Sequence, residues 1–254
     1  MYVLPYGQMS LWGYFSSLKF LNLRIDKLIN ENMFFVNSIN SLKSLIRYKG
    51  WQRIGPHNFD VISIIFGSLL GDGHAEKRIG GVGTRITFQQ ENAHIKYAIW
   101  LHGLLSTRGY CNSVIPVATS KIEKNGKLRQ VVRFRTWTYT SFNWIHDLWY
   151  VSRIKRVPSC IKDYLTPLAL AIWVMDDGSK TGKSLKLCTN SFSYSDCLLL
   201  VNCLSDNFSI KATVQLAGAK SKDQYHIYIR VESMVNLRQI VSPYIVPEMM
   251  YKII

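Results

Sequence analysis

The sequence predicts an α+β protein built from two similar halves. Two apolar runs of helix length, at residues 59–73 and 164–178, each end in Asp-Gly. The aspartates of these pairs, Asp72 and Asp177, stand 105 residues apart, a spacing that suits a duplicated domain better than a solenoid repeat. Segments in which apolar and polar residues alternate follow each run, and this pattern is typical of half-buried antiparallel strands.

The first half predicts at least two strands with a helix between them. In residues 85–89, Ile86 and Phe88 share one face and polar side chains share the other. The segment 129–137 alternates in the same way and has three arginines on its polar face. Between these two strands, the apolar spacing of residues 93–105 predicts a helix.

The second half repeats this pattern. Residues 213–216 alternate polar and apolar side chains, and residues 226–231 place His226, Tyr228 and Arg230 on one face. A helix is expected over residues 194–204. The exposed faces of all these strands are polar or basic rather than acidic.

The segment ahead of the repeats has a different character. Residues 14–56 alternate apolar clusters with Asn, Ser and Lys, which predicts poorly specified helix ending near Gly50 and Gly55. We therefore divide the chain into a leader at 1–56, a first repeat at 57–160 and a second repeat at 161–254.

The charge of the chain favours a polyanionic partner. The 254 residues include 31 Lys and Arg against 16 Asp and Glu, a formal charge of +15. Hydrophobic residues make up 48% and aromatic residues 13%, which excludes global disorder. Such a surplus indicates nucleic acid first and an anionic membrane second. The first repeat carries +8 and the second +2, and no run of five like charges occurs, so folding must arrange the charge.

Other classes of protein fit the sequence less well. The five cysteines are odd in number and form no CxxC pair, which argues against a disulfide framework and a zinc ribbon. We expect most of them to be small buried hydrophobes in a reducing compartment. Pro5, Gly7 and Gly13 interrupt the uncharged N-terminal stretch, so no membrane-spanning segment and no membrane partner are predicted. The six histidines form no cluster of the HNH-nuclease kind.

The two Asp-Gly ends suggest a metal site between the halves. Gly67 and Gly71 lie four residues apart on one helical face, where the missing side chains let a second helix approach closely. Ala169 offers a small residue in the other run. Two such helices packed together bring Asp72 and Asp177 near each other, at the helix ends where a carboxylate is least favourable.

A divalent cation between these carboxylates would relieve their repulsion. Hard oxygen ligands with open water positions suit magnesium, which can activate water to cleave a phosphodiester. The alternative is two Asp-Gly turns that only end helices. Because the pair recurs at the same place in both repeats, we favour the metal site.

At these residues the sequence resembles the LAGLIDADG homing endonucleases, in the form that carries both motifs on one chain. Residues 65–73 and 170–178 match the nine-residue motif, with Asp72 and Asp177 at its eighth position. The resemblance covers roughly residues 57–254.

This resemblance implies two αββαββα halves related by pseudo-two-fold symmetry. Their saddle-shaped antiparallel sheets would lie in the DNA major groove, and the motif helices would form the interface between the halves. The motif departs from its usual pattern at Leu70, and Asp176 stands where the first copy has Gly71. Neither departure touches the catalytic position.

The resemblance also implies the site residues. Asp72 and Asp177 would bind Mg²⁺ or Mn²⁺, helped by the backbone carbonyls of Gly71 and Asp176. Two lysines near the active site would be Lys155 and Lys252, with Lys162 as a rival to Lys155, and Gln89 matches a polar residue found after the first strand.

The exposed strand faces would read the DNA. Arginine pairs bidentately with guanine and glutamine with adenine, and lysines in turns contact phosphates. The base-reading residues would be Arg85, Arg129, Arg133, Arg135, Gln215 and Arg230, and the turn lysines, Lys183 among them, would contact the backbone.

The first residues of the chain indicate where the reading frame comes from. Tyr2–Gly13 closely resembles an internal stretch of apocytochrome b, and the likeness stops at Tyr14. An intron reading frame that continues from its upstream exon would have this form.

Three functions are therefore weighed. The leading hypothesis is an intron-encoded, mitochondrial, monomeric double-strand DNA endonuclease whose target is the intron insertion site. The runner-up is a maturase that binds its own group I intron RNA and assists its splicing, with cleavage lost or retained. A regulator that binds nucleic acid without catalysis is disfavoured by the paired carboxylates.

Overall fold

The computed structural model describes residues 53, 55–122, 126, 128–218 and 223–254. In the first repeat the elements follow the order αββαββα that the resemblance implies. They are α2 (Phe59–Leu70), β1 (His74–Lys77), β2 (Thr84–Glu91), α3 (Ile95–Ser106), β3 (Ala118–Ile122), β4 (Leu128–Arg135) and α4 (Asn143–Trp149).

The second repeat has the same order of elements. They are α6 (Pro167–Asp177), β7 (Gly178–Thr181), β8 (Ser184–Cys188), α7 (Tyr194–Phe208), β9 (Ala212–Leu216), β10 (Tyr225–Ile229) and α8 (Met234–Val241). The hairpin of β5 (Tyr150–Val151) and β6 (Ile154–Lys155) and the short helix α5 (Ile161–Tyr164) connect the repeats. A 3-10 helix, η5 (Pro247–Lys252), comes near the C-terminus.

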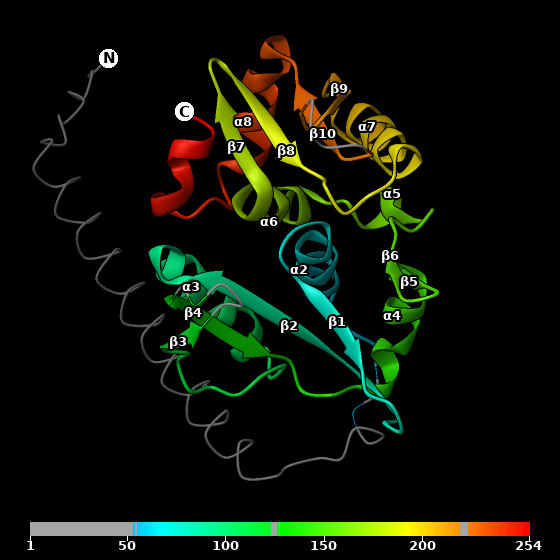
Figure 1. Ribbon diagram of the computed structural model, residues 1–254, viewed down its shortest axis with the longest axis vertical. Coiled ribbons are helices and arrows are strands. Elements are labelled where there is room, and N and C mark those ends of the chain that lie inside the picture. Colours follow the sequence, from blue (N-terminus) through cyan, green and yellow to red (C-terminus); the bar gives the residue numbers. More distant parts are fainter. Residues whose placement is uncertain (1–52, 54, 123–125, 127, 219–222) are drawn as a thin grey trace, which may run out of the picture. The chain divides into compact units, whose positions relative to one another are not determined.

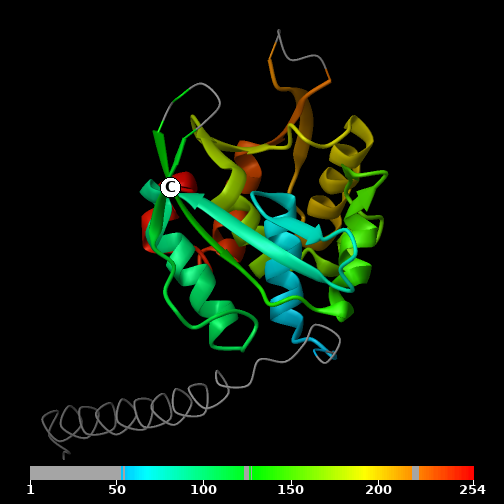
Figure 2. The same ribbon diagram turned by 60° about the horizontal axis from the view of Figure 1, so that its bottom comes forward.

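The two large sheets share one topology. The strand orders are β1-β2-β4-β3 and β7-β8-β10-β9, and every pair of neighbours is antiparallel. Helix α3 packs against β2 and β4, and α7 packs against β9 and β10, as can be followed in Figure 2. The opposite face of each sheet carries the polar residues. The predicted α+β duplication is confirmed.

Local sequence signals explain where the main helices begin. The side chain of Asn58 accepts hydrogen bonds from the first backbone N–H groups of α2, and that of Thr166 accepts one from the N–H of Ala169 in α6. Pro167 occupies the first turn of α6, where a missing N–H costs nothing. A capping box between Ser193 and Asp196 starts α7.

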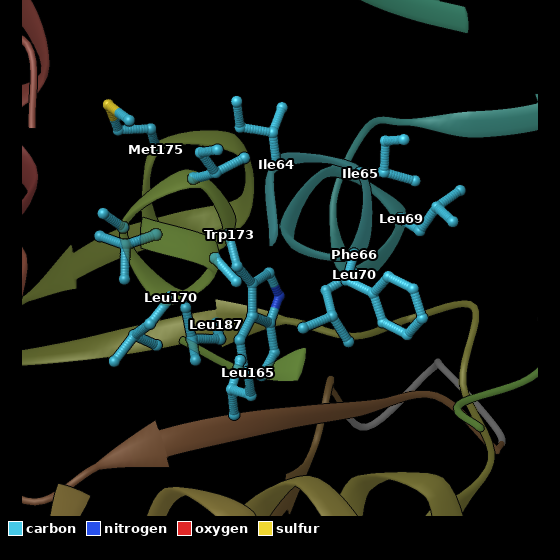
Figure 3. Close-up of a cluster of buried hydrophobic side chains, with 14 of the residues drawn as sticks. Ile64, Ile65, Phe66, Leu69, Leu70, Leu165, Leu170, Trp173, Met175 and Leu187 are labelled. Atoms are coloured by element: carbon cyan, nitrogen blue, oxygen red, sulfur yellow. The ribbon is translucent and has the colours of Figure 1, made fainter. Parts of the chain in front are cut away.

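Helices α2 and α6 pack against each other at the centre of the two repeats (Figure 1). A Cβ atom on Gly67 would lie 2.5 Å from the carbonyl oxygen of Ala169, so only glycine allows this approach. Below the crossing, the fully buried Trp173 ring lies between Leu187 on one side and Leu70 on the other (Figure 3). The predicted close packing of the motif helices is confirmed.

Two of the predicted segments, the last strand and the leader, differ from or lie outside what the structure describes. Strand β10 ends at Ile229, so Arg230 follows the strand, and its backbone N–H donates to the carbonyl of Lys211. The expected helix within 14–56 lies almost wholly outside the described residues. Arg53, which the predicted division assigns to the leader, donates to the carbonyl of Thr138 in the first repeat.

The five cysteines are all free, and Cys111, Cys197 and Cys203 are buried, as expected of small hydrophobes. Within the described ranges, every helix is too short or too polar to cross a bilayer.

Candidate active site

Asp72 and Asp177 lie where the two central helices end. Asp72 follows the end of α2 by two residues, and Asp177 is the last residue of α6. Burial raises the pKa of both carboxyls, and the charge of Asp72 adds to the rise at Asp177, whose pKa reaches about 7. The two motifs therefore bring their aspartates together, as their spacing predicts.

A glutamine connects the two repeats beside these carboxylates. The Nε2 atom of Gln90 donates to Oδ2 of Asp72 at 3.0 Å and to Oδ1 of Asp176 at 2.9 Å. Gln90 is buried at the end of β2. Its hydrogen bond lowers the pKa of Asp72, against the larger effect of burial.

The side chain of Asp176 lies inside this network. It accepts hydrogen bonds from the hydroxyl of Tyr97 at 2.8 Å and from the backbone N–H of Asp72 at 3.3 Å, besides the one from Gln90. Burial and the charges of Asp72 and Asp177 raise its pKa well above the ordinary value. Asp176 thus adds a third carboxylate to the site.

Two lysines complete the site, one from each repeat. The Nζ atom of Lys155 donates to the carbonyl oxygens of Gly73 at 3.1 Å and Gly71 at 3.3 Å. The Nζ atom of Lys252 donates to the carbonyls of Met175 and Asp176. Both lysines therefore bind the backbone at the ends of the motif helices.

Burial lowers the pKa of both ammonium groups, to about 8 for Lys155. Lys155 is coupled most strongly to Asp177, whereas Lys252 is coupled more strongly to Asp176 and Asp177 than to Asp72. Lys252 lowers the pKa of Asp72 more than Lys155 does, and Lys155 lowers that of Asp177 more than Lys252 does.

Two residues from the sequence analysis lie elsewhere. Gln89 accepts hydrogen bonds from Arg133 on the polar face of the sheet, so the glutamine that reaches the carboxylates is its neighbour Gln90. Lys162, the rival of Lys155, pairs with Asp206 at 2.7 Å on the exposed surface. The expectation that Gln89 lies at the carboxylates was therefore wrong, and so was Lys162 as the rival of Lys155.

A signal for Gln90 was present in the sequence. Because Ile86 and Phe88 face the core, strand alternation puts residue 90 on the same side and residue 89 on the other. Tyr97, by contrast, carries no such signal, since only the packing of α3 brings its hydroxyl to Asp176.

The donor set fits a hard divalent cation. In the part of the chain that the structure describes, no three His, Cys, Asp or Glu side chains form a metal-holding group. Burial and the charges of Asp72, Lys155 and Lys252, rather than a hydrogen bond, set the pKa of the Asp177 carboxyl. Magnesium suits such a site because it is commonly held by one or two carboxylates together with substrate phosphates. Asp72 and Asp177 would hold the ion, which would polarise a phosphate and activate water.

The polar face of the first sheet is rich in arginine. Arg85 forms a bidentate ion pair with Glu76, at 2.7 Å for the closest contact, and Arg129 pairs with Glu91. Burial and the neighbouring arginines lower the pKa of Arg135. These guanidinium groups form the predicted basic surface of the first repeat.

The second sheet has a more neutral polar face. Gln215 lies directly opposite His226, and Tyr228 lies opposite Lys186. Lys183 is exposed in the turn between β7 and β8. Lys186 is a basic residue on this face that the sequence analysis missed, although strand alternation places it there.

Comparison with known proteins agrees with this geometry. The sequence model of the LAGLIDADG DNA endonuclease family matches residues 62–237, which contain both large sheets, the whole of α6 and all but the first turn of α2. The chain belongs to this family. As a LAGLIDADG protein it has the duplicated fold and the paired aspartates described above.

Two fungal relatives are similar over most of the LAGLIDADG chain. The "Cytochrome b mRNA maturase bI2" of Saccharomyces cerevisiae is 48% identical over 231 residues, which are 89% of this chain and 53% of that protein. The protein of the same name from Debaryomyces hansenii is 46% identical over 198 residues, 78% of this chain and 75% of that protein. This chain thus spans about half the length of the first relative.

A solved structure has the same fold. It is titled "The homing endonuclease I-WcaI bound to its DNA recognition sequence", is 25% identical, and has a TM-score of 0.67 over 78% of this chain and 87% of that chain.

Proposed function

We propose that this chain is a site-specific DNA endonuclease that cuts both strands of the duplex at the insertion site of its own intron. The observation that carries the proposal is the pair of carboxylates, Asp72 and Asp177, at the adjoining ends of α2 and α6. Two phosphodiesters, one on each strand, need two such centres, and the single chain supplies both. It would therefore act as a monomer.

The chemistry follows from the surroundings of the carboxylates. Mg²⁺ or Mn²⁺ bound by Asp72 and Asp177 would supply Lewis-acid activation of a phosphate and of a water molecule. Lys155 and Lys252 place positive charge beside these carboxylates, where negative charge develops as the phosphodiester is attacked. The arginine-rich face of the first sheet would hold the duplex.

The N-terminal residues of the chain suggest which gene contains the DNA target. Tyr2–Gly13 resembles apocytochrome b, and the two fungal relatives are named as cytochrome b mRNA maturases. We place the intron in a mitochondrial cytochrome b gene and the activity in the mitochondrion.

The decisive experiment incubates the purified chain and Mg²⁺ with a duplex that spans an intronless apocytochrome b junction. Wild-type protein should cut both strands. Asp72→Asn and Asp177→Asn should each abolish double-strand cleavage and keep DNA affinity, since the sheets are untouched. Asp206→Asn, which removes an exposed carboxylate paired with Lys162, is the matched control and should cut normally.

Two outcomes contradict the proposal. Intact duplex after incubation with wild-type protein removes nuclease activity on this target. Full double-strand cleavage by either Asn variant removes the two-carboxylate mechanism.

A second activity, RNA maturation, is favoured by the names of the relatives. Those named as maturases are 46–48% identical, whereas the "Intron-encoded endonuclease ai4" of Dictyostelium discoideum is 34% identical. We propose that the chain also assists splicing of its host intron RNA. Splicing of that RNA in vitro, with and without the protein, tests this proposal. The Asp72→Asn variant should assist splicing as well as wild-type protein does, because RNA binding needs no carboxylate. An unchanged splicing rate on adding the protein would contradict it.

A further inference from the structure

The two motif copies differ at their seventh position, where the second repeat has Asp176. The two residues at this position fit each other in space. The first repeat has Gly71 at this position. A Cβ atom on Gly71 would lie 2.4 Å from Cβ of Asp176 and 2.6 Å from its Oδ2 atom. The carboxylate of the second repeat therefore occupies the space that the glycine of the first leaves open.

Among the residues that the structure describes, the hydrogen bonds that the Asp176 carboxylate accepts all come from the first repeat. Its three donors are the backbone N–H of Asp72, the amide of Gln90 and the hydroxyl of Tyr97, at 3.3, 2.9 and 2.8 Å. Gln90 in turn donates to the carboxylate of Asp72. The Asp176 side chain thus holds the backbone of Asp72 and also Gln90, which donates to the Asp72 carboxylate.

The described part of the second repeat has no matching arrangement. Extending the registers of the two hairpins places Gln90 opposite Gly71 and Thr189 opposite Asp176. The hydroxyl of Thr189, the counterpart of Gln90, donates to the carbonyl of Tyr225 at 2.7 Å. The two aspartates of the site are therefore held differently.

We propose that Asp176 is a positioning residue for one of the two cleavage centres: it orients Asp72 and Gln90, and it leaves Asp177 unconstrained. The inference rests on the proposed endonuclease function. Its consequence is that the two DNA strands depend unequally on Asp176. A general structural defect would instead slow both strands alike.

The first test measures each strand separately, with a different label at each 5′ end of the duplex and protein in excess. Asp176→Ala should slow one strand between about 10- and 100-fold, the range found when a group that orients a metal ligand is removed. The other strand should change less than about threefold. Asp176→Asn, which keeps the volume and one acceptor oxygen, should lose less than Asp176→Ala, and Asp206→Asn should leave both rates unchanged.

A second test needs no cleavage. In wild-type protein the Asp72 amide donates to Asp176, and this hydrogen bond should protect it from hydrogen exchange. Asp176→Ala should speed exchange at Asp72 while Ile65, inside α2, keeps its protection and the DNA affinity stays within about threefold. If wild type fails to cut DNA, the endonuclease proposal falls, and this exchange experiment still decides the role of Asp176.

A third test asks whether Asp176 acts through Gln90. The double variant Asp176→Ala/Gln90→Ala should be no slower on the affected strand than Gln90→Ala alone, because coupled residues are not additive. Equal slowing of both strands, multiplicative effects in the double variant, or unchanged exchange at Asp72 would each overturn the proposal.

Discussion

The carboxyl of Asp177 is held in surroundings that favour its protonated form. Burial and the charge of Asp72 raise its pKa to about 7. Between the ordinary pKa and this raised one the folded protein binds more protons than the unfolded chain, so stability falls as pH rises through that window. A site built for a cation therefore costs stability when it holds none.

This gives a prediction for the metal-free protein. Asp177→Asn should raise the melting temperature by a few degrees at pH 8, where the wild-type carboxylate is charged, and by much less at pH 5, where it is protonated. Thermal unfolding in EDTA at both values measures the difference. Equal stabilisation at the two values would show that the ionised carboxylate is not the cause.

Lys155 and Lys162 make a matched pair of lysines around the same connection between the repeats. Lys155 is bound to the carbonyls of Gly71 and Gly73, whereas Lys162 pairs with Asp206 on the surface. Lys155→Met should slow cleavage about 100-fold, as expected for loss of a charged group beside the reacting phosphate. Lys162→Met should cleave at the wild-type rate. Comparable loss in both variants would remove the assignment of Lys155.

At the scale of elements, the crossing of α2 and α6 decides whether the two aspartates meet. A Cβ atom on Gly67 would lie 2.5 Å from the carbonyl oxygen and 2.9 Å from Cα of Ala169, both backbone atoms that cannot turn away. Small residues at this crossing therefore serve the site as well as the fold.

Two glycine substitutions test this crossing. Gly67→Ala should lower the free energy of unfolding by about 1–3 kcal/mol, because the helices must separate to admit a methyl group. Gly103→Ala, in α3 where a Cβ would meet nothing within 4 Å, should raise it by about 0.5–1 kcal/mol, the helix propensity difference. Urea unfolding measures both. A Gly67→Ala variant as stable as wild type would contradict the close crossing.

At the scale of the whole molecule, charge is arranged by face. On the helix side, Lys96, Arg108 and Lys162 are each paired with an acid. On the polar face of the first sheet, Arg85 and Arg129 also pair with acids, and burial together with the charges of neighbouring arginines lowers the pKa of Arg135. The first repeat carries +8 against +2 for the second, and Arg133 and Arg135 on the polar face of its sheet contribute part of this surplus.

This arrangement predicts unequal half-sites. Duplex affinity should fall steeply with salt, by about 1,000-fold between 50 and 200 mM for six phosphate contacts. Arg133→Ala should relax base preference in one half-site only, as read by binding selection on randomised duplexes. Arg108→Ala, paired with Asp60 on the helix side, is the control and should leave selection unchanged. Relaxation in both halves would contradict the unequal faces.

Much of this could be predicted from the sequence because its signals are local. The alternation around Ile86 and Phe88 predicts a strand, and the two Asp-Gly ends predict a duplicated helix end. The inward direction of Gln90 also follows from strand alternation, although the motif resemblance pointed to its neighbour Gln89. The alternation of side chains along a strand and the presence of small residues on a helix face are properties of a single segment. They can therefore be seen in the sequence without knowing which segment packs against it.

The sequence by itself therefore determined the duplicated α+β fold, the pair Asp72 and Asp177, and the basic character of the strand faces. Only the tertiary structure decided that Lys155, rather than Lys162, binds the backbone carbonyls at the end of α2. It also decided that Gln90 bridges Asp72 and Asp176, and that the Asp176 carboxylate accepts a hydrogen bond from Tyr97. Those contacts join residues that lie 18 to 86 positions apart in the chain. No local pattern encodes them, because they depend on how closely two helices cross at Gly67 and on the sheet that each helix carries with it.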